Sequence, residues 1–408
     1  MEYHLGGKIG LKLLKELKNQ KDLSMAYTPG VSKVCQAIKE DESKTFSLTS
    51  RGNLVAVVTD GTAVLGLGNL GAKASIPVME GKAVLFKSFA GVDAWPVPIE
   101  GVSGEDGRTD VDKFVEATCQ VACMYGGINL EDVAAPACFE IEDRLDEILD
   151  IPVFHDDQWG TAIITLAAFK NYSILTSKQP KDISVVINGA GAAGLRIAEM
   201  LKIEGVTDCI LCDSKGVIHA GRDDINGHKK IHAVQTSKRS FADAMKGADV
   251  FIGVSVADCV TPEMVLSMAD YPAILAMANP VPEISPEVVI ECMEGREYIM
   301  ATGRSDYPNQ VNNVLGFPFI FRGALDVRAK KITIGMKVAA AEALAALARE
   351  KKIPPVVKKA YKRDFKFGPN YLIPTPFDPR IAMWESKAVA EAAIRDGVAE
   401  KAKLPDTY

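Results

Sequence analysis

No part of this 408-residue chain is an unbroken apolar run of the about eighteen residues that a membrane span needs. The sequence also has no basic block, and its net charge of -6 is spread along the chain, which argues against nucleic acid as a partner. The first twenty residues lack the apolar core of a signal peptide. We therefore expect a cytoplasmic protein without a nucleic-acid or membrane partner.

Cysteine clusters are equally scarce. The eight cysteines are scattered, and Cys209 and Cys212 alone suggest the C-x-x-C spacing of a redox or zinc site. They fall in an apolar run, 208–213, that favours a strand, in which residues three apart point to opposite sides. We expect inert, buried thiols here.

The residues that are present indicate a globular protein of two or three domains, since 48% of them are hydrophobic. Extended and helical patterns alternate, with extended segments at 94–99, 128–133 and 151–154 and helical ones at 109–124, 136–149 and 160–175. This order predicts an α/β fold with a parallel or mixed sheet. We place an N-terminal α/β catalytic domain at 1–157 and a second domain at 158–408. An amphipathic stretch from Ile9 to Leu17 is expected to be a surface or dimer-packing helix.

The second domain begins with a dinucleotide-binding pattern. A strand at 183–188 runs into a glycine-rich turn and a helix at 195–204, and a strand at 209–212 ends at Asp213, nineteen residues beyond the turn. The residues of the turn are Gly189, Ala190, Gly191, Ala192, Ala193 and Gly194. Such glycines let pyrophosphate approach the start of a helix, and the acid suits a ribose hydroxyl. We predict a Rossmann-like, doubly wound domain, with further strands at 249–254, 273–278 and 298–301 and C-terminal helices such as 336–349.

A second copy of the glycine pattern, Gly66, Gly68 and Gly71, has weak support because no clear helix or ribose-binding acid follows it. Lys82, which precedes an apolar run at 83–86, is expected at the edge of an element. Tyr27 is expected on a loop that enters a helix at 31–40. On the residues alone, packing is the simpler role for both side chains.

Two pairs of acids end apolar segments, Glu131 with Asp132 and Asp156 with Asp157. Carboxyl ends of parallel strands meet at one sheet edge, so we expect the two turns to meet. At about 4 Å, each pair of like charges repels by roughly 4 kcal/mol, so converging carboxylates require a cation. Ligation by oxygen alone favours Mg²⁺ or Mn²⁺.

Taken together, the motifs resemble those of the malic enzymes, especially the short bacterial and archaeal type. They are YTPGV at 27–31, VTDGTAVLGLGNLG at 58–71, PVMEGK at 77–82, NLED at 129–132, HDDQWGTA at 155–162, GAGAAG at 189–194, ANPVPE at 278–283 and ATGRSDYPNQVNN at 301–313. The resemblance implies oxidative decarboxylation of L-malate to pyruvate and CO₂ with reduction of NAD or NADP. It also implies a homodimer or higher homo-oligomer.

The resemblance assigns roles to the candidate residues. It implies metal binding by Glu131, Asp132 and Asp157, and catalysis by Tyr27 as general acid and by Lys82 or Asp156 as the base. Asn279, Asn312 and Asn313 resemble the asparagines that bind malate and the nicotinamide side of the cofactor.

Two positions depart from the family pattern. Ala63 replaces the arginine that larger members use for the malate carboxylate, and Trp159 stands where the bacterial type commonly has histidine, at the expected mouth of the site. The choice between NAD and NADP also stays open, since Asp213 would repel a 2′-phosphate and Lys215 would offset that charge. The alternative functions are a metal-dependent oxaloacetate decarboxylase without net redox and a non-catalytic dinucleotide sensor.

Overall fold

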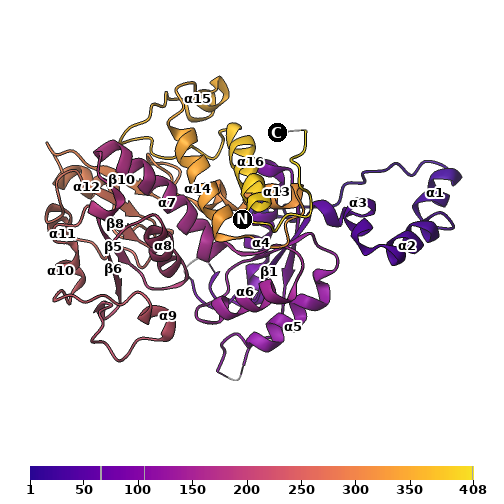
Figure 1. Ribbon diagram of the computed structural model, residues 1–408, viewed down its shortest axis with the longest axis horizontal. Coiled ribbons are helices and arrows are strands. Elements are labelled where there is room, and N and C mark those ends of the chain that lie inside the picture. The colour runs from indigo at the N-terminus through magenta and orange to yellow at the C-terminus, as the bar shows by residue number, and fades with distance from the viewer. Residues whose placement is uncertain (65–66, 105, 407) are drawn as a thin grey trace.

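The computed structural model describes residues 1–64, 67–104, 106–406 and 408 of the chain. Figure 1 shows two α/β units side by side, with the C-terminal helices packed over both and an N-terminal arm that projects beyond the body of the molecule. The α/β fold expected from the sequence is confirmed.

The first sheet is parallel throughout and has the order β2-β1-β3-β4. Its strands are β1 (Leu54–Thr59), β2 (Asp93–Pro98), β3 (Gly127–Leu130) and β4 (Val153–His155). The helices that connect them are α4 (Ala72–Ala90), α5 (Val111–Ala122) and α6 (Ala137–Ile148). Because the strands are parallel, the residues that follow β3 and β4 emerge at the same edge of the sheet.

The second sheet has the order β10-β9-β8-β5-β6-β7, in which β7 alone is antiparallel among these strands. Its strands are β5 (Ser184–Asn188), β6 (Asp208–Asp213), β7 (Gly216–Val217), β8 (Val250–Gly253), β9 (Ala273–Ala276) and β10 (Ile299–Thr302). The helices of this unit are α8 (Ala192–Ile203), α9 (Gly227–Lys230), α10 (Phe241–Met245), α11 (Pro262–Leu266) and α12 (Pro286–Cys292). The strand order reverses between β5 and β8, which is where doubly wound sheets bind dinucleotides.

Burial on both faces of the second sheet explains the unbroken apolar runs in its strands. Val185 and Ile187 of β5 pack in the main core, whereas Val186 between them packs in a second core on the other face. Successive strand residues point to opposite faces, so a strand covered on both sides must be apolar at every position.

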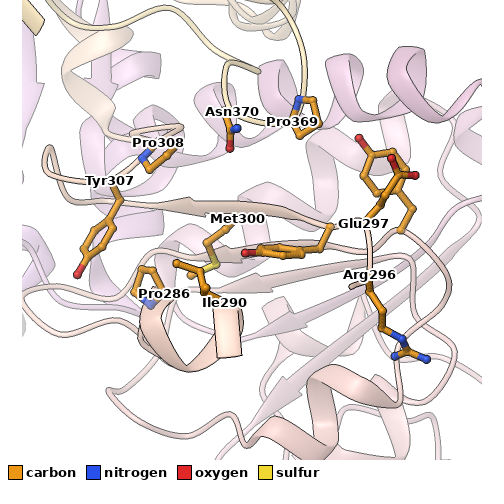
Figure 2. Close-up of a pocket in the computed structure, with 11 residues that line it drawn as sticks. Pro286, Ile290, Arg296, Glu297, Met300, Tyr307, Pro308, Pro369 and Asn370 are labelled. Carbon is orange, nitrogen blue, oxygen red and sulfur yellow. The ribbon is translucent and has the colours of Figure 1, made fainter. Parts of the chain in front are cut away.

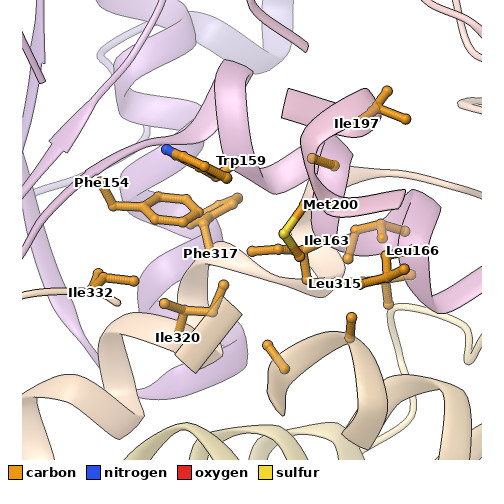
Figure 3. Packing of buried hydrophobic residues seen from close by; sticks show 14 of the residues in the cluster. Phe154, Trp159, Ile163, Leu166, Ile197, Met200, Leu315, Phe317, Ile320 and Ile332 are labelled. Carbon is orange, nitrogen blue, oxygen red and sulfur yellow. The ribbon is translucent and has the colours of Figure 1, made fainter. Parts of the chain in front are cut away.

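Helix α7 (Asp156–Thr176) joins the two units and is mostly buried. Trp159 and Ile163 of this helix pack with Met200 of α8 and with Leu315 and Phe317, as Figure 3 shows. The main core is therefore continuous from the first sheet to the second. The C-terminal helices that complete it are α13 (Phe317–Asp326), α14 (Ile334–Ala348), α15 (Pro355–Tyr361) and α16 (Arg380–Arg395).

The N-terminal arm corrects one expectation. Residues 9–17 do not form a helix; the first α-helices are α1 (Gln20–Ala26), α2 (Val31–Glu40) and α3 (Thr45–Leu48). Short 3-10 turns also occur at Glu2–His4, Glu42–Lys44, Ser50–Asn53, Pro180–Asp182 and Asn313–Leu315. Leu11 and Leu14 are 91% and 79% exposed, so the apolar face of this segment is not packed against the described part of the chain. A helix this short is not stable without such packing.

Helix α4 corrects a second expectation. It begins directly after Gly71 and continues through Pro77, so Lys82 lies inside a helix rather than at the edge of an element. Pro77 removes one backbone donor and crowds the carbonyl of the preceding turn, and packing of α4 on the sheet outweighs this cost. Gly66, in the second copy of the glycine pattern, lies outside the described residues. Within the described parts of the chain, no helix is long and apolar enough to cross a membrane.

Candidate metal and dinucleotide site

The two acidic turns meet at the carboxyl edge of the first sheet. One carboxylate oxygen from each of Glu131, Asp132 and Asp157 lies within 4.8 Å of the others. The backbone N–H of Asp132 also donates to Asp157 Oδ2 over 2.8 Å, which fixes one turn against the other. Asp132 has a φ of +54°, so the chain turns sharply here and directs consecutive acids to one point.

Burial and mutual repulsion act together on these acids. Burial raises the pKa values of Glu131 and Asp157, and for Glu131 the charges of the neighbouring aspartates raise it further. A divalent cation would remove both penalties, so the residues present fit an oxygen-liganded Mg²⁺ or Mn²⁺.

Lys82 contacts this cluster through Glu131. Its ammonium is 3.0 Å from Glu131 Oε1, forms an ion pair with Asp156, and lies 4.6 Å from the centre of the Phe317 ring. Burial by itself would lower the pKa of Lys82, but the charges of Asp156, Glu131 and Asp157 outweigh burial and raise it. Lys82 is therefore an ammonium group when these carboxylates are charged.

Asp156 is completely buried and is the meeting point of the site. Its Oδ2 accepts hydrogen bonds from Lys82 and, over 2.5 Å, from Asn313 Nδ2. Its Oδ1 is buried without a hydrogen-bond partner among the described residues, so one oxygen remains to accept a proton or a ligand. Burial raises the pKa of Asp156, while the Lys82 charge lowers it in part. Gly160 leaves room for this carboxylate, since a Cβ there would lie 2.1 Å from Oδ1.

Trp159 lies in the core and not at the mouth of the site, which corrects the position expected from the sequence. The indole is 4% exposed and donates to Glu142 Oε2 over 3.0 Å. The charged ends of Arg196 and Lys337 lie 4.4 Å and 3.4 Å from the ring centre. Sequence reasoning missed this group, because the partners come from three other helices.

The glycine-rich turn after β5 has the geometry expected of a dinucleotide loop. A Cβ on Gly194 would lie 1.7 Å from the carbonyl oxygen of Gly189, so this helix start can approach the turn only because the residue is glycine. A Cβ on Gly191 would meet nothing within 4 Å, which leaves that side of the loop open. Helix α8 starts at Ala192 rather than at 195, so its first N–H groups belong to the turn itself.

Asp213 ends β6 beside this loop, and the N–H of Gly189 donates to the neighbouring carbonyl of Cys212 over 3.0 Å. Burial by itself would raise the pKa of Asp213, but hydrogen bonds from Arg222 and Lys229 lower it to about 2. The sequence indicated the acid and gave no sign of these two partners.

The predicted asparagines have different surroundings. Asn313 contacts Asp156, whereas Asn312 Oδ1 accepts from the N–H of Val314 and caps its own turn. Asn279 is exposed after β9 and lies over Gly303. Glu283, which sequence reasoning did not single out within the ANPVPE motif, is fully buried and accepts the N–H groups of Ser255 and Ala278. It thereby joins the ends of β8 and β9. The sequence signal that could have identified it is the acid within the ANPVPE motif.

Tyr27 is the one predicted catalytic residue that this chain does not bring to the cluster. It lies between α1 and α2, as expected, but these helices belong to the projecting arm (Figure 1), and the side chain is 68% exposed.

A separate pocket of about 320 Å³ lies along β10, the edge strand of the second sheet, and includes none of the predicted site residues. Figure 2 shows Met300 and Ile290 among the apolar side chains that line it, with Arg296 and Glu297 at one end. The pocket belongs to the second sheet, whereas the carboxylates lie at the edge of the first, so it is separate from the site described above.

Comparison with known proteins agrees with this geometry. Two family models match the sequence: "Malic enzyme, N-terminal domain" over residues 7–146 and "Malic enzyme, NAD binding domain" over residues 159–361. The crystal structure of malic enzyme from Pyrococcus horikoshii superposes with a TM-score of 0.86 at 40% identity, covering 97% of this chain and 88% of that one.

The curated relatives differ in length and in the cofactor that they are named for. The chain is 52% identical over 398 residues to the "Bifunctional malic/malolactic enzyme" of Bacillus subtilis, covering 96% of this chain and 91% of the relative. It is also 52% identical over 399 residues to the "NADP-dependent malic enzyme" of Rhizobium meliloti, covering 97% of this chain. It spans about half the length of that relative, at 51%. An "NAD-dependent malic enzyme" of Geobacillus stearothermophilus is 47% identical over 406 residues, with coverage of 98% and 80%.

Proposed function

Since the chain belongs to the malic enzyme family, we propose that it converts L-malate to pyruvate and CO₂ while reducing NAD or NADP. One observation supports this above all others: the buried Lys82–Asp156 pair directly adjoins three carboxylates that converge within 4.8 Å. A proton acceptor and a divalent-cation site in contact suit the oxidation of a hydroxy acid whose product then decarboxylates.

Glu131, Asp132 and Asp157 would hold Mg²⁺ or Mn²⁺. When bound, the cation supplies Lewis-acid polarisation of the C2 oxygen of malate. Asn129 Nδ2 donates to Glu131 Oε2 over 3.1 Å and so orients this carboxylate. The N–H of Asp132 does the same for Asp157.

The proton of the C2 hydroxyl is accepted by the Lys82–Asp156 pair. With Lys82 already an ammonium group, the site in the pair that can take a further proton is Asp156, which has one unpartnered oxygen and a pKa raised by burial. Hydride then passes from C2 to the nicotinamide, and the bond between C3 and the departing carboxylate breaks. We assign Asn313, which contacts Asp156, to the binding of malate. We assign Asn279 to the carboxylate of malate or to the carboxamide of the nicotinamide. Asn312 Oδ1 already accepts the N–H of Val314, so its amide nitrogen is the group that we assign to the substrate.

Tyr27, the proposed general acid that protonates C3, must come from a second copy of the chain. Its arm exposes Leu11, Leu14 and Leu17 together with Tyr27, a set of apolar groups that favours burial against a protein surface. The cluster around Lys82 has no tyrosine from its own arm. A homodimer in which the arms exchange would bury the leucines and complete both sites. The cytoplasmic location expected from the sequence is part of the same proposal.

The first experiment follows absorbance at 340 nm with L-malate and Mn²⁺ in the presence of NAD or NADP. We expect reduction that EDTA and Lys82→Ala abolish and that Lys87→Ala preserves, because Lys87 lies on the same helix but pairs at the surface with Asp93. Folded protein that decarboxylates oxaloacetate but reduces neither cofactor would favour the decarboxylase alternative. Dinucleotide binding without either reaction would favour the sensor.

The origin of Tyr27 is tested by coexpressing the inactive variants Tyr27→Phe and Lys82→Ala. If Tyr27 acts on the partner's site, each mixed dimer has one complete site, and a random mixture regains about a quarter of the wild-type activity. If Tyr27 acts within its own chain, no complete site forms and the mixture stays inactive. Light scattering of the same samples establishes that dimers are present.

A further inference from the structure

The acid at the end of β6 is already neutralised in this protein. Arg222 binds both oxygens of Asp213, with Nη1 to Oδ1 at 2.8 Å and Nη2 to Oδ2 at 3.1 Å, and Lys229 Nζ lies 2.8 Å from Oδ2. The side chains of Asp213 and Arg222 are only 11% and 10% exposed, so this is a fixed pair rather than a transient surface contact. An acid held in this way has little capacity left for the hydroxyls of a ribose.

A third cation joins the same network. Lys215 follows Asp213 in the turn between β6 and β7, and its ammonium pairs with Asp224 at 2.8 Å. Asp224 also accepts from Arg222, so the ion pairs connect three cations, Lys215, Arg222 and Lys229, with two carboxylates. The network therefore carries one surplus positive charge beside the dinucleotide loop.

The ammonium groups provide the donors that an anion would need. The guanidinium of Arg222 is occupied by its two carboxylates, but each lysine ammonium has three N–H groups and gives one of them to the acids of the network. The side chain of Lys215 is 68% exposed and that of Lys229 is 24% exposed, so both ammonium groups are open to a ligand that binds beside Asp213.

We propose that Lys215 and Lys229 bind the 2′-phosphate of the cofactor and that Arg222 cancels the charge of Asp213, so that this chain selects NADP over NAD. This inference rests on the proposed function, since it specifies the cofactor of that dinucleotide site. The chemistry is general: an acid beyond the glycine-rich turn suits a ribose hydroxyl, whereas a cation near it accommodates a phosphate.

The test compares the binding of two adenosine probes to the full chain by titration calorimetry. These are adenosine 2′,5′-bisphosphate, which has the 2′-phosphate, and 5′-AMP, which lacks it. We expect the bisphosphate to bind at least about tenfold more tightly, as a charged hydrogen bond allows. Lys229→Gln and Lys215→Gln should each reduce its affinity several-fold with little effect on 5′-AMP. The control is Lys230→Gln, which removes a neighbouring exposed charge outside the network.

The possible outcomes are distinct. Equal affinity for both probes, tighter binding of 5′-AMP, or lysine variants that bind the bisphosphate like the wild type would overturn the proposal and leave the malic enzyme function intact. Failure of both probes to bind the folded protein would contradict the dinucleotide site and the proposed function together. Because Lys215 is at the surface, its variant is expected to fold even if Lys229→Gln does not.

Discussion

Replacing Asp157 by asparagine should raise the Tm of the metal-free protein and weaken the stabilisation by Mn²⁺, so that the order of the two Tm values depends on the metal. Three carboxylate oxygens within 4.8 Å repel one another, and at an effective dielectric of 20 each pair costs about 3.5 kcal/mol. Lys82 compensates part of this charge, and the Asp157 side chain is 36% exposed, so water screens it. After that discount, removing one charge should stabilise the metal-free protein by about 1–2 kcal/mol.

Bound metal should act in the opposite direction. Mn²⁺ at about 100 times its dissociation constant stabilises the native state by about 2.7 kcal/mol. For a chain of this length melting as one unit, that corresponds to a rise in Tm of about 3 °C. We therefore expect Asp157→Asn to melt about 1–2 °C above the wild type in EDTA. With Mn²⁺ present, we expect it to melt below the wild type.

Scanning calorimetry of both proteins, in EDTA and with Mn²⁺, measures the four Tm values. Asparagine is the chosen replacement because it preserves the acceptor for the Asp132 N–H. Asp112→Asn is the control, because Asp112 is an exposed acid paired with Arg144 and should show the full response to Mn²⁺. A wild-type response of Asp157→Asn to Mn²⁺, or a lower Tm than the wild type in EDTA, would contradict a metal site at these carboxylates.

Two further predictions concern the glycine-rich turn and a buried lysine. Gly194→Ala should lower the Tm, since its Cβ would lie 1.7 Å from the carbonyl oxygen of Gly189. Gly191→Ala should keep the wild-type Tm but weaken NADPH binding measured by fluorescence, because we expect the open side of the loop to face the pyrophosphate. Identical behaviour of the two variants would contradict this geometry. Burial lowers the pKa of Lys337 from the ordinary lysine value of 10.5 to about 8. The charged groups around it are Glu142, Arg196, Glu199 and Asp146. Between pH 8 and 10.5 the folded state therefore binds fewer protons than the unfolded state. The free energy of unfolding of the wild type should therefore rise over that pH range. Lys337→Met should be more stable than the wild type at pH 7 by up to about 3 kcal/mol, and this advantage should shrink above pH 8. A difference in urea unfolding that does not change with pH would refute the lowered pKa of Lys337.

Much of the fold could be predicted because its signals are local. The apolar runs that became β5, β8 and β9 are buried on both faces and therefore continuous in the sequence, and the turn at 189–194 has glycines where backbone approaches backbone. The N-terminal segment 9–17 and helix α4 were predicted wrongly for the same reason. Whether an amphipathic or proline-containing stretch is helical depends on the surface that it packs against. Neighbouring residues in the sequence do not identify that surface.

By itself, the sequence determined the alternation of strands and helices, the glycine-rich turn, and the placement of acid pairs at strand ends, because each depends on residues that are near neighbours in the chain. Only the tertiary structure decided that Lys82 is clamped between Glu131 and Asp156, that Trp159 is buried, and that Arg222 and Lys229 neutralise Asp213. These pairings join residues far apart in sequence or across turns of irregular shape. Their energies depend on distance and burial, which are properties of the folded chain.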